Sequence, residues 1–229
     1  MDLYGEKSKS IPQKTVLLVL EIIILGVSYW ILFGNGYRKI MSPFTETFAT
    51  GNNVRHIILF IFNCIVFLRI LITIFYLLKR KMPWEEAISI PFAFAIYYIG
   101  FALLGYKSGN TIGIIDLPGI LLFFLGSCLN TISELQRDKW KKLPENKGHL
   151  YSAGLFKYSM HINYFGDILW VSAYAILTRN WYSVIIPLWL FCFFAFFNAP
   201  KLDRYLASKY GKEFEDYRKK TKKLIPFLY

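Results

Sequence analysis

Residues 15–33 read TVLLVLEIIILGVSYWILF, and this stretch decides the class of fold. Glu21 is its single charged residue. A helix needs roughly 20 mainly apolar residues to cross the hydrocarbon core of a bilayer. The stretch therefore predicts a membrane-spanning helix. Because no small-residue cleavage site follows it, we interpret it as an anchor rather than a removable signal peptide.

Five further segments share this apolar character. They are residues 57–78, 87–106, 117–135, 165–177 and 182–197. Segment 165–177 is short for a bilayer, and we expect it to pair with the last segment as a helical hairpin across Thr178-Arg179-Asn180. The pattern predicts an all-α fold, a polytopic membrane helix bundle of about six transmembrane helices.

The composition supports a membrane protein. Hydrophobic residues make up 55% of the 229 residues, aromatic residues 19% and charged residues 18%, whereas soluble domains carry about 25% charged residues. This excludes a disordered chain, a collagen-like repeat and a small disulfide scaffold. The three cysteines lie singly inside apolar runs, which predicts membrane-buried thiols rather than disulfide bridges or metal ligands. The three histidines lie far apart and there is no cysteine pair, so we expect no metal site.

The net charge of +12 is explained by membrane topology. With the N-terminus inside, 21 basic residues lie on the inner side and 5 on the outer side, and Arg69 lies within a span. We therefore expect cytoplasmic N- and C-termini in a multi-pass protein of a bacterial inner membrane, or of the endoplasmic reticulum in a eukaryote. Basic residues at the ends of apolar segments do not indicate a nucleic-acid partner. The expected partners are membrane lipids and a lipid-soluble small-molecule substrate, and the oligomeric state stays open.

We expect two parts in the chain. Residues 1–116 hold N-terminal transmembrane helices on the substrate side, and residues 117–229 form a C-terminal membrane domain with a basic cytoplasmic tail. From Asn130 onward polar and ionisable groups gather on the inner side, where we expect any cofactor pocket. No glycine-rich Rossmann or P-loop pattern occurs.

One helical face in the second part is polar. Spacings of four, three and four separate Asn130, Glu134, Arg137 and Lys141. Residues at these spacings share one face of a helix. One interpretation is a solvated helix end with Glu134 paired to Arg137. The other is a phosphate-binding stripe, because Arg and Lys one turn apart can bind adjacent phosphates.

A polar cluster also precedes segment 165–177. It holds His161, Asn163, Tyr164 and Asp167, which are costly to bury without partners and so predict a ligand site. The tail after Pro200 either folds over this site or lies on anionic lipid as a polybasic segment.

At these residues the chain resembles a known family. The region from Gln136 to Asp167, together with Lys209-Tyr210-Gly211 and the closing Ile225-Pro226-Phe227-Leu228-Tyr229, is similar to the C-terminal domain of steroid 5-alpha-reductases. It looks like their bacterial branch, a domain of unknown function, and is also similar to sterol C14-reductases. The shared elements are Gln136-Arg137, Asn146-Lys147-Gly148, Gly154-Leu155-Phe156-Lys157-Tyr158-Ser159, His161-Ile162-Asn163-Tyr164 and Phe165-Gly166-Asp167.

The resemblance implies an NADPH pocket on the cytoplasmic side. Arg137 and Lys141 meet phosphate in this scheme, and His161, Asn163 and Tyr164 hold the cofactor. The full set of implied cofactor-binding residues is Asn130, Gln136, Arg137, Lys141, Phe156, His161, Asn163, Tyr164, Asp167, Asp203, Lys209, Tyr210 and Tyr217.

Three departures from the family pattern bear on cofactor identity. Met160 stands where the family has Arg, Ile162 where it has Pro, and Asp167 where it has Glu. Either a phosphate contact is missing or another base compensates. One alternative is a methyltransferase of the related branch that uses S-adenosylmethionine, although the Glu-Glu pair typical of those enzymes is absent at Lys201-Leu202-Asp203-Arg204-Tyr205. A second alternative is a catalytically degenerate protein that binds lipid.

The resemblance implies reduction of a carbon–carbon double bond conjugated to a carbonyl, by hydride from NADPH, in a lipid or steroid-like substrate. The enolate formed needs a proton donor near its oxygen. The candidate catalytic residues are Glu21, Tyr97 and Tyr98, since desolvation within a span favours a neutral, donating carboxyl.

Overall fold

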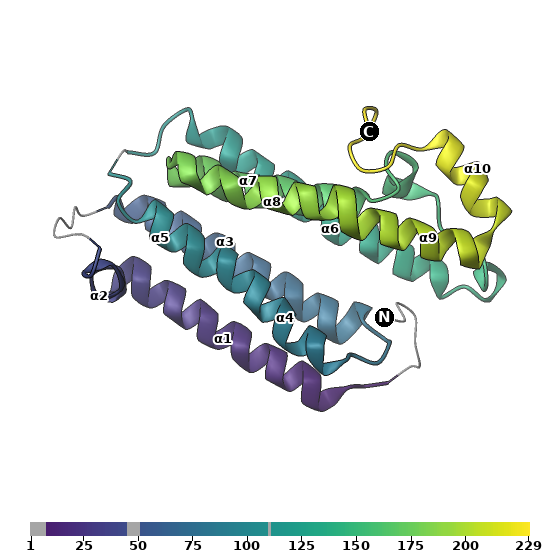
Figure 1. Cartoon of the computed structure of the whole chain (residues 1–229), viewed down its shortest axis with the longest axis horizontal. Helices are drawn as coiled ribbons and strands as arrows, with labels where there is room; N and C mark the ends of the chain where they lie inside the picture. The colour runs from purple at the N-terminus through teal and green to yellow at the C-terminus, as the bar shows by residue number, and fades with distance from the viewer. Residues whose placement is uncertain (1–7, 45–50, 110) are drawn as a thin grey trace. The chain divides into compact units, whose positions relative to one another are not determined.

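The computed structural model describes residues 8–44, 51–109 and 111–229, and all regular secondary structure in these residues is helical. The chain forms two compact units (Figure 1). The first unit comprises Met1–Gly119 and Tyr174–Val184, and the second comprises Ile120–Ala173 and Ile185–Tyr229.

The first unit is built from long helices joined by short connections. Its helices are α1 (Ile11–Phe33), α2 (Gly36–Met41), α3 (Asn53–Leu71) with a π-helical continuation (Ile72–Leu77), and α4 (Trp84–Ala95), which continues through a π-helical segment (Ile96–Gly100) into α5 (Phe101–Gly105). Helix α1 packs against α3, α4 and the segment Ile96–Gly100. This packing brings Glu21 of α1 into the interior with the tyrosines of the π-helical segment.

The second unit holds most of the C-terminal half. Its helices are α6 (Asp116–Lys141), α7 (Ile162–Thr178), α8 (Ile185–Phe193), a π-helical segment (Phe194–Asn198), α9 (Ala199–Tyr210) and α10 (Lys212–Lys220), with 3-10 turns at Pro144–Asn146 and Gly154–Lys157. The first residues of α6 and the last residues of α7 belong to the first unit, as does a 3-10 turn at Trp181–Val184.

Five helices of the described residues are long and apolar enough to cross a membrane. They are Ile11–Phe33, Asn53–Leu77, Trp84–Gly105, Asp116–Lys141 and Trp181–Tyr210. Large side chains such as Ile22, Phe92 and Leu188 are exposed on these helices, as lipid-facing residues are. The polytopic all-α prediction is confirmed, and the chain is a multi-pass membrane protein. The predicted short segment forms α7, which has 17 residues.

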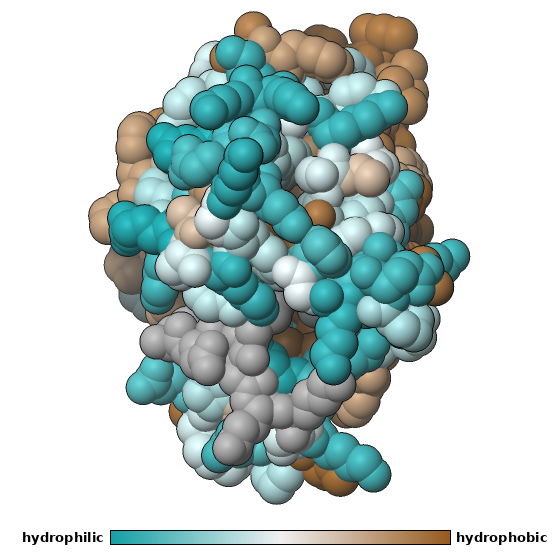
Figure 2. All heavy atoms as spheres, turned by 90° about the vertical axis from the view of Figure 1, so that its right-hand side faces the viewer, coloured by the Kyte–Doolittle hydropathy of each residue, from teal (hydrophilic) through white to brown (hydrophobic). Residues whose placement is uncertain are grey.

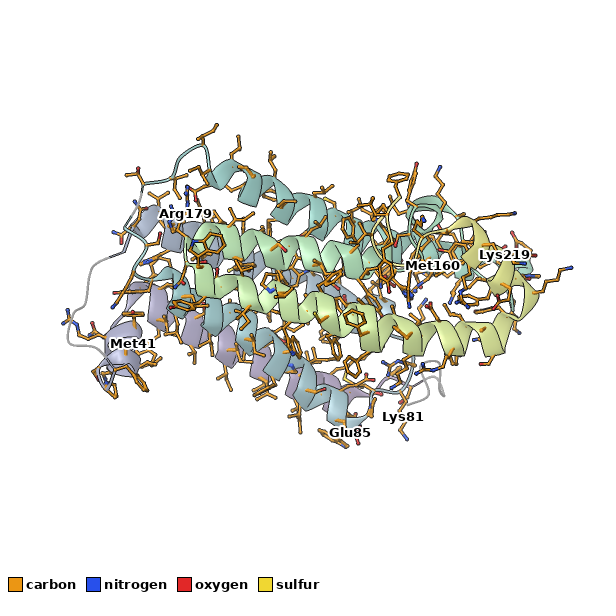
Figure 3. All side chains as sticks on the ribbon, turned by 45° about the horizontal axis from the view of Figure 1, so that its top comes forward. Met41, Lys81, Glu85, Met160, Arg179 and Lys219 are labelled. Carbon is orange, nitrogen blue, oxygen red and sulfur yellow. The ribbon has the colours of Figure 1, made fainter. Side chains whose placement is uncertain are left out.

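Charged side chains gather at the two ends of the first unit. Met41 and Arg179 mark one end in Figure 3, and Lys81 and Glu85 mark the other. Near Arg179, the carboxylate of Asp116 pairs with Arg55 at 2.7 Å and with Arg179 at 2.9 Å. At the opposite end Arg80 pairs with Glu86 at 2.8 Å. The charged ends and apolar middle fit a membrane-spanning unit, and the predicted orientation stays a prediction.

Candidate functional site

The backbones of α6 and α7 touch in the second unit, and this crossing places the first polar pair. A Cβ atom added to Gly166 would lie 2.7 Å from the backbone nitrogen of Asn130, and one on Gly126 would lie 2.6 Å from that of Trp170. Glycine is therefore required at both positions. One turn beyond the crossing, the Asn130 amide donates to Oδ1 of Asp167 at 2.9 Å.

Glu134 links the next turn of α6 to α7. Its Oε1 accepts a hydrogen bond of 2.9 Å from the Asn163 amide, and its Oε2 pairs with Arg137. The interpretation that Glu134 pairs with Arg137 is confirmed. The Arg137 guanidinium lies 5.4 Å from the centre of the Phe156 ring, so a cation and an aromatic face stand together.

The 3-10 turn at Gly154–Lys157 is fixed against α6. Gly154 has a φ of 59°, and a Cβ there would lie 2.6 Å from the Tyr151 hydroxyl. The glycine lets the Leu155 amide donate to Oε1 of Gln136 at 3.0 Å. Ile162 is buried in a cluster with Tyr151 and Phe156, which gives position 162 a packing role.

His161 is a buried centre of the site. It is 1% exposed, and its Nε2 lies 2.8 Å from Oδ1 of Asp203 on α9. The His161 ring stacks on Tyr164 at 5.2 Å between centroids, and Tyr164 stacks on Phe194 at 4.4 Å. Segments more than 30 residues apart in the sequence thus hold the imidazole ring of His161 in place.

The C-terminal segment is bound to the same place. The amide of Met160 donates to Lys222 O at 2.8 Å, and that of His161 donates to Lys223 O at 3.1 Å. The Ser159 hydroxyl donates to Leu224 O at 2.8 Å. We call residues 222–224 the strap.

Met160 packs beneath helix α10. It is buried with Phe214 and Tyr217, and Figure 3 labels it close to this helix, which also carries Lys219. A cationic side chain at position 160 would be buried in this apolar cluster at a high cost in free energy, which explains why a methionine fits there.

Tyr217 joins α10 to the 3-10 turn. Its hydroxyl donates to Phe156 O at 2.6 Å. Burial raises the pKa of Tyr217, the negative charge of Asp203 raises it further, and Arg137 opposes both effects. Asp203 and Arg137 therefore both act on this one hydroxyl.

The predicted cofactor residues divide into two groups. Those brought into the connected cluster are Asn130, Gln136, Arg137, Phe156, His161, Asn163, Tyr164, Asp167, Asp203 and Tyr217. Lys141 is exposed at the end of α6, and Lys209 is exposed on α9 with its Nζ 3.3 Å from the Tyr205 hydroxyl. Tyr210 packs against the cluster of Met160.

Some residues of the cluster were not predicted. Four of them contact predicted residues: Ser159 accepts the His161 amide, Phe194 stacks on Tyr164, Trp170 donates to Asp167 and Lys223 pairs with Asp203. Ser159 lay inside the quoted motif without a role. Lys223 was one of nine basic residues in the tail, and composition does not distinguish it from the others.

The chemistry of the second unit fits a dinucleotide. Cations suit phosphates, and amides suit carbonyl and hydroxyl groups. Figure 2 shows the end of the molecule at the right of Figure 1, where hydrophilic residues cover much of the surface. Within the described residues no group of three or more His, Cys, Asp or Glu could hold a metal ion.

The first unit holds the predicted proton donors. Glu21 and Tyr98 are both fully buried, and neither the carboxylate oxygens nor the tyrosine hydroxyl have a hydrogen-bond partner among the described residues. The two groups lie within electrostatic range of each other. Tyr97 is also buried, at 6% exposure. Unpartnered buried polar groups are rare in proteins and call for an explanation.

Two other buried polar side chains of this unit, Tyr174 and Asn63, are paired. The Tyr174 hydroxyl donates to the Asn63 carbonyl oxygen at 2.7 Å, and the Asn63 amide donates to Ser28 at 2.8 Å. Glu21 and Tyr98 differ from these paired groups, and the Ser108 hydroxyl shares their lack of a hydrogen-bond partner among the described residues.

Comparisons with known proteins agree with these observations. The chain is 32% identical over 111 residues to rat (Rattus norvegicus) 3-oxo-5-alpha-steroid 4-dehydrogenase 2, covering 48% of this chain and 42% of that protein. It is 26% identical over 174 residues to Steroid 5-alpha-reductase DET2 of Gossypium hirsutum, covering 69% of this chain and 65% of that protein. It is also 30% identical over 92 residues to a probable O-methyltransferase ustE of Ustilaginoidea virens, covering 40% of this chain and 32% of that protein.

The chain thus spans less than half of the length of the rat enzyme. A family model described as "Protein of unknown function (DUF1295)" matches residues 88–221, which is more than half of the chain. The homologous steroid 5-alpha-reductases support a reductase family. The chain therefore belongs to the DUF1295 family and is steroid 5-alpha-reductase-like.

Proposed function

We propose that the protein is a membrane-embedded, NADPH-dependent reductase of a carbon–carbon double bond conjugated to a carbonyl in a lipid or steroid-like substrate. The observation that carries the proposal is the buried pair of Glu21 and Tyr98, whose polar atoms have no hydrogen-bond partner among the described residues. The similarity to steroid 5-alpha-reductases supports the reaction class.

The second unit binds the cofactor in this proposal. Arg137 meets a phosphate, while Asn130, Asn163 and His161 hydrogen-bond to the nucleotide. Phe156 and Tyr164 pack beside Arg137 and His161 and hold them in position. NADPH supplies a hydride when bound. The Asn130–Asp167, Glu134–Asn163 and His161–Asp203 hydrogen bonds hold these groups in place, which limits the entropy lost on binding.

The first unit polarises the substrate. A carboxylate without a partner is far more costly to bury than a carboxylic acid, so Glu21 carries its proton. As the β-carbon gains hydride, negative charge develops on the carbonyl oxygen, and Glu21 and Tyr98 donate hydrogen bonds to it. Their buried position excludes the water that would compete for these donors.

The setting is a membrane with both termini and the basic segments on the cytoplasmic side. The bias of basic residues supports this orientation. A bacterial inner membrane is the proposed location. Lipid-soluble substrates would reach the apolar helices directly from the bilayer, whereas the water-soluble cofactor would come from the cytoplasm.

A second candidate is transfer of a methyl group from S-adenosylmethionine. The similarity to a probable O-methyltransferase favours it, although over 92 residues only. A protein that binds lipid without catalysis is the third candidate, supported by Met160 and Ile162, whose side chains pack in apolar clusters.

Nucleotide binding separates the three candidates. The detergent-purified protein is titrated with NADPH, NADH and S-adenosylmethionine while its tryptophan fluorescence is followed. Micromolar binding of NADPH, weakened by Arg137→Ala, supports the reductase and leads to a screen of lipid-soluble enones. A preference for S-adenosylmethionine contradicts it in favour of methyl transfer. Binding of none of the three contradicts both and favours the lipid-binding protein.

A further inference from the structure

Lys223 is held beside the buried histidine of the second unit. Its backbone oxygen accepts the His161 amide at 3.1 Å, and its Nζ lies 3.7 Å from Oδ2 of Asp203. The other carboxylate oxygen of Asp203 is bound by His161. One carboxylate therefore faces both the imidazole and the ammonium group.

The backbone of Lys223 is fixed, whereas its side chain is not. Hydrogen bonds from the Met160 and His161 amides and from the Ser159 hydroxyl hold the strap. At 3.7 Å, the ammonium is farther from Asp203 than the roughly 2.7–2.9 Å of a charged hydrogen bond. The side chain is 27% exposed, so Asp203 attracts the ammonium without fixing its donors, which can turn to a ligand.

A second cation lies near the same residues. The Arg137 guanidinium lies 5.4 Å from the centre of the Phe156 ring, and the Phe156 carbonyl accepts the Tyr217 hydroxyl at 2.6 Å. The charges of Arg137 and Asp203 both act on this hydroxyl, and Asp203 is the partner of Lys223. Met160, which lies next to His161 in the chain, is buried in an apolar cluster and contributes no charge. Lys223 of the strap therefore supplies a positive charge near His161, which the adjacent Met160 does not.

We propose that Lys223 binds a phosphate group of the nucleotide and acts with Arg137 as the second cation of the phosphate site. A phosphate carries more than one negative charge, and pairs of cationic side chains are its usual partners in proteins. This inference rests on the proposed function, because it assumes a nucleotide in the second unit. It adds a binding residue outside residues 88–221, which the family model matches.

The test compares two neighbouring lysines. Lys223→Met removes the charge beside Asp203, and Lys222→Met removes the same charge from an exposed position one residue earlier. Binding of NADPH and NADH is titrated at two salt concentrations, with Lys223→Arg as the conservative variant. Neither side chain takes part in the backbone bonds of the strap, so thermal unfolding should be similar for all variants.

We expect Lys223→Met to raise the Kd for NADPH about tenfold or more, since a charge-assisted contact is lost. Lys222→Met should change it less than twofold, and Lys223→Arg should stay near the wild type. A loss confined to NADPH identifies the 2′-phosphate, and a loss for both nucleotides identifies the diphosphate. Equal effects of the two methionine variants, or no effect of Lys223→Met, overturn the inference while the reductase proposal stands. Failure of the wild type to bind either nucleotide overturns both.

Discussion

The Asn130 amide lies 2.9 Å from the Asp167 carboxylate, and the pair sits one turn beyond the contact of two glycines. Asp167 also accepts the indole N–H of Trp170 at 2.7 Å. The polar pair therefore depends on how closely the α6 and α7 backbones approach. This relationship connects helix packing with the orientation of a predicted cofactor residue.

Gly166→Ala should destabilise the second unit. The added Cβ would lie 2.7 Å from backbone atoms, which cannot rotate away, so α6 and α7 must separate. Overpacking of this kind costs about 1–3 kcal/mol. Thermal unfolding in detergent should show a lower Tm and, after refolding, weaker nucleotide binding. Gly26→Ala is the control, because a Cβ there meets nothing within 4 Å. An equal decrease in Tm in both variants would contradict a close contact of the α6 and α7 backbones at Gly166.

Glu21→Gln should lower turnover of an enone substrate and leave NADPH affinity nearly unchanged. The amide keeps the size of the side chain but donates a weaker hydrogen bond to the developing oxyanion, and loss of such a donor costs about 10²–10³ in kcat. Steady-state kinetics and a nucleotide titration measure the two effects. A tenfold loss of NADPH affinity would count against the assignment.

Tyr98→Phe should reduce turnover more than Tyr97→Phe. The two tyrosines are neighbours and both are buried, but Tyr98 has the hydroxyl with no hydrogen-bond partner among the described residues. This makes Tyr97→Phe a matched control for packing. Turnover under saturating NADPH distinguishes them, and the reverse order would move the donor role to Tyr97.

Asp116→Asn should strongly destabilise the first unit. The side chains of Asp116 and Arg55 are fully buried, and the substitution leaves the guanidinium without its counterion. Removal of one partner of a buried pair costs about 3–5 kcal/mol. The exposed pair of His149 and Glu213 is the control, and Glu213→Gln should lower the Tm far less. A similar decrease in Tm in the two variants would show that burial does not determine how much the Asp116–Arg55 pair stabilises the unit.

Tyr217 should make stability depend on alkaline pH. Burial and Asp203 raise its pKa above the ordinary value, so the folded state favours the neutral hydroxyl. The stabilisation is complete below the unfolded pKa of about 10 and is lost as the pH rises above it. The difference in Tm between the wild type and Tyr217→Phe should therefore shrink between pH 8 and pH 11. A Tm difference that stays constant over this pH range would show that the titration of Tyr217 does not affect stability.

Sequence periodicity predicted the helices better than it predicted the contacts between them. The apolar runs identified the spanning helices, and the spacing of Glu134 and Arg137 predicted their ion pair, because both depend on local geometry. A tail that folds over this site was one of two predicted alternatives, but the strap itself was not predicted, because backbone hydrogen bonds between residues 160–161 and 222–223 leave no pattern in side-chain chemistry. For the same reason, neither the burial of Met160 nor the position of Lys223 could be found from spacing.

The strap also sets an order for biosynthesis. Domains fold as units while the chain emerges, and the partners of the Met160 and His161 amides are made some 60 residues later. Until residues 222–224 leave the ribosome, these two amides and the Ser159 hydroxyl lack their backbone acceptors. A nascent chain stalled within α10 would thus contain the five apolar helices of the described residues and still present an unfinished second unit to the quality-control machinery.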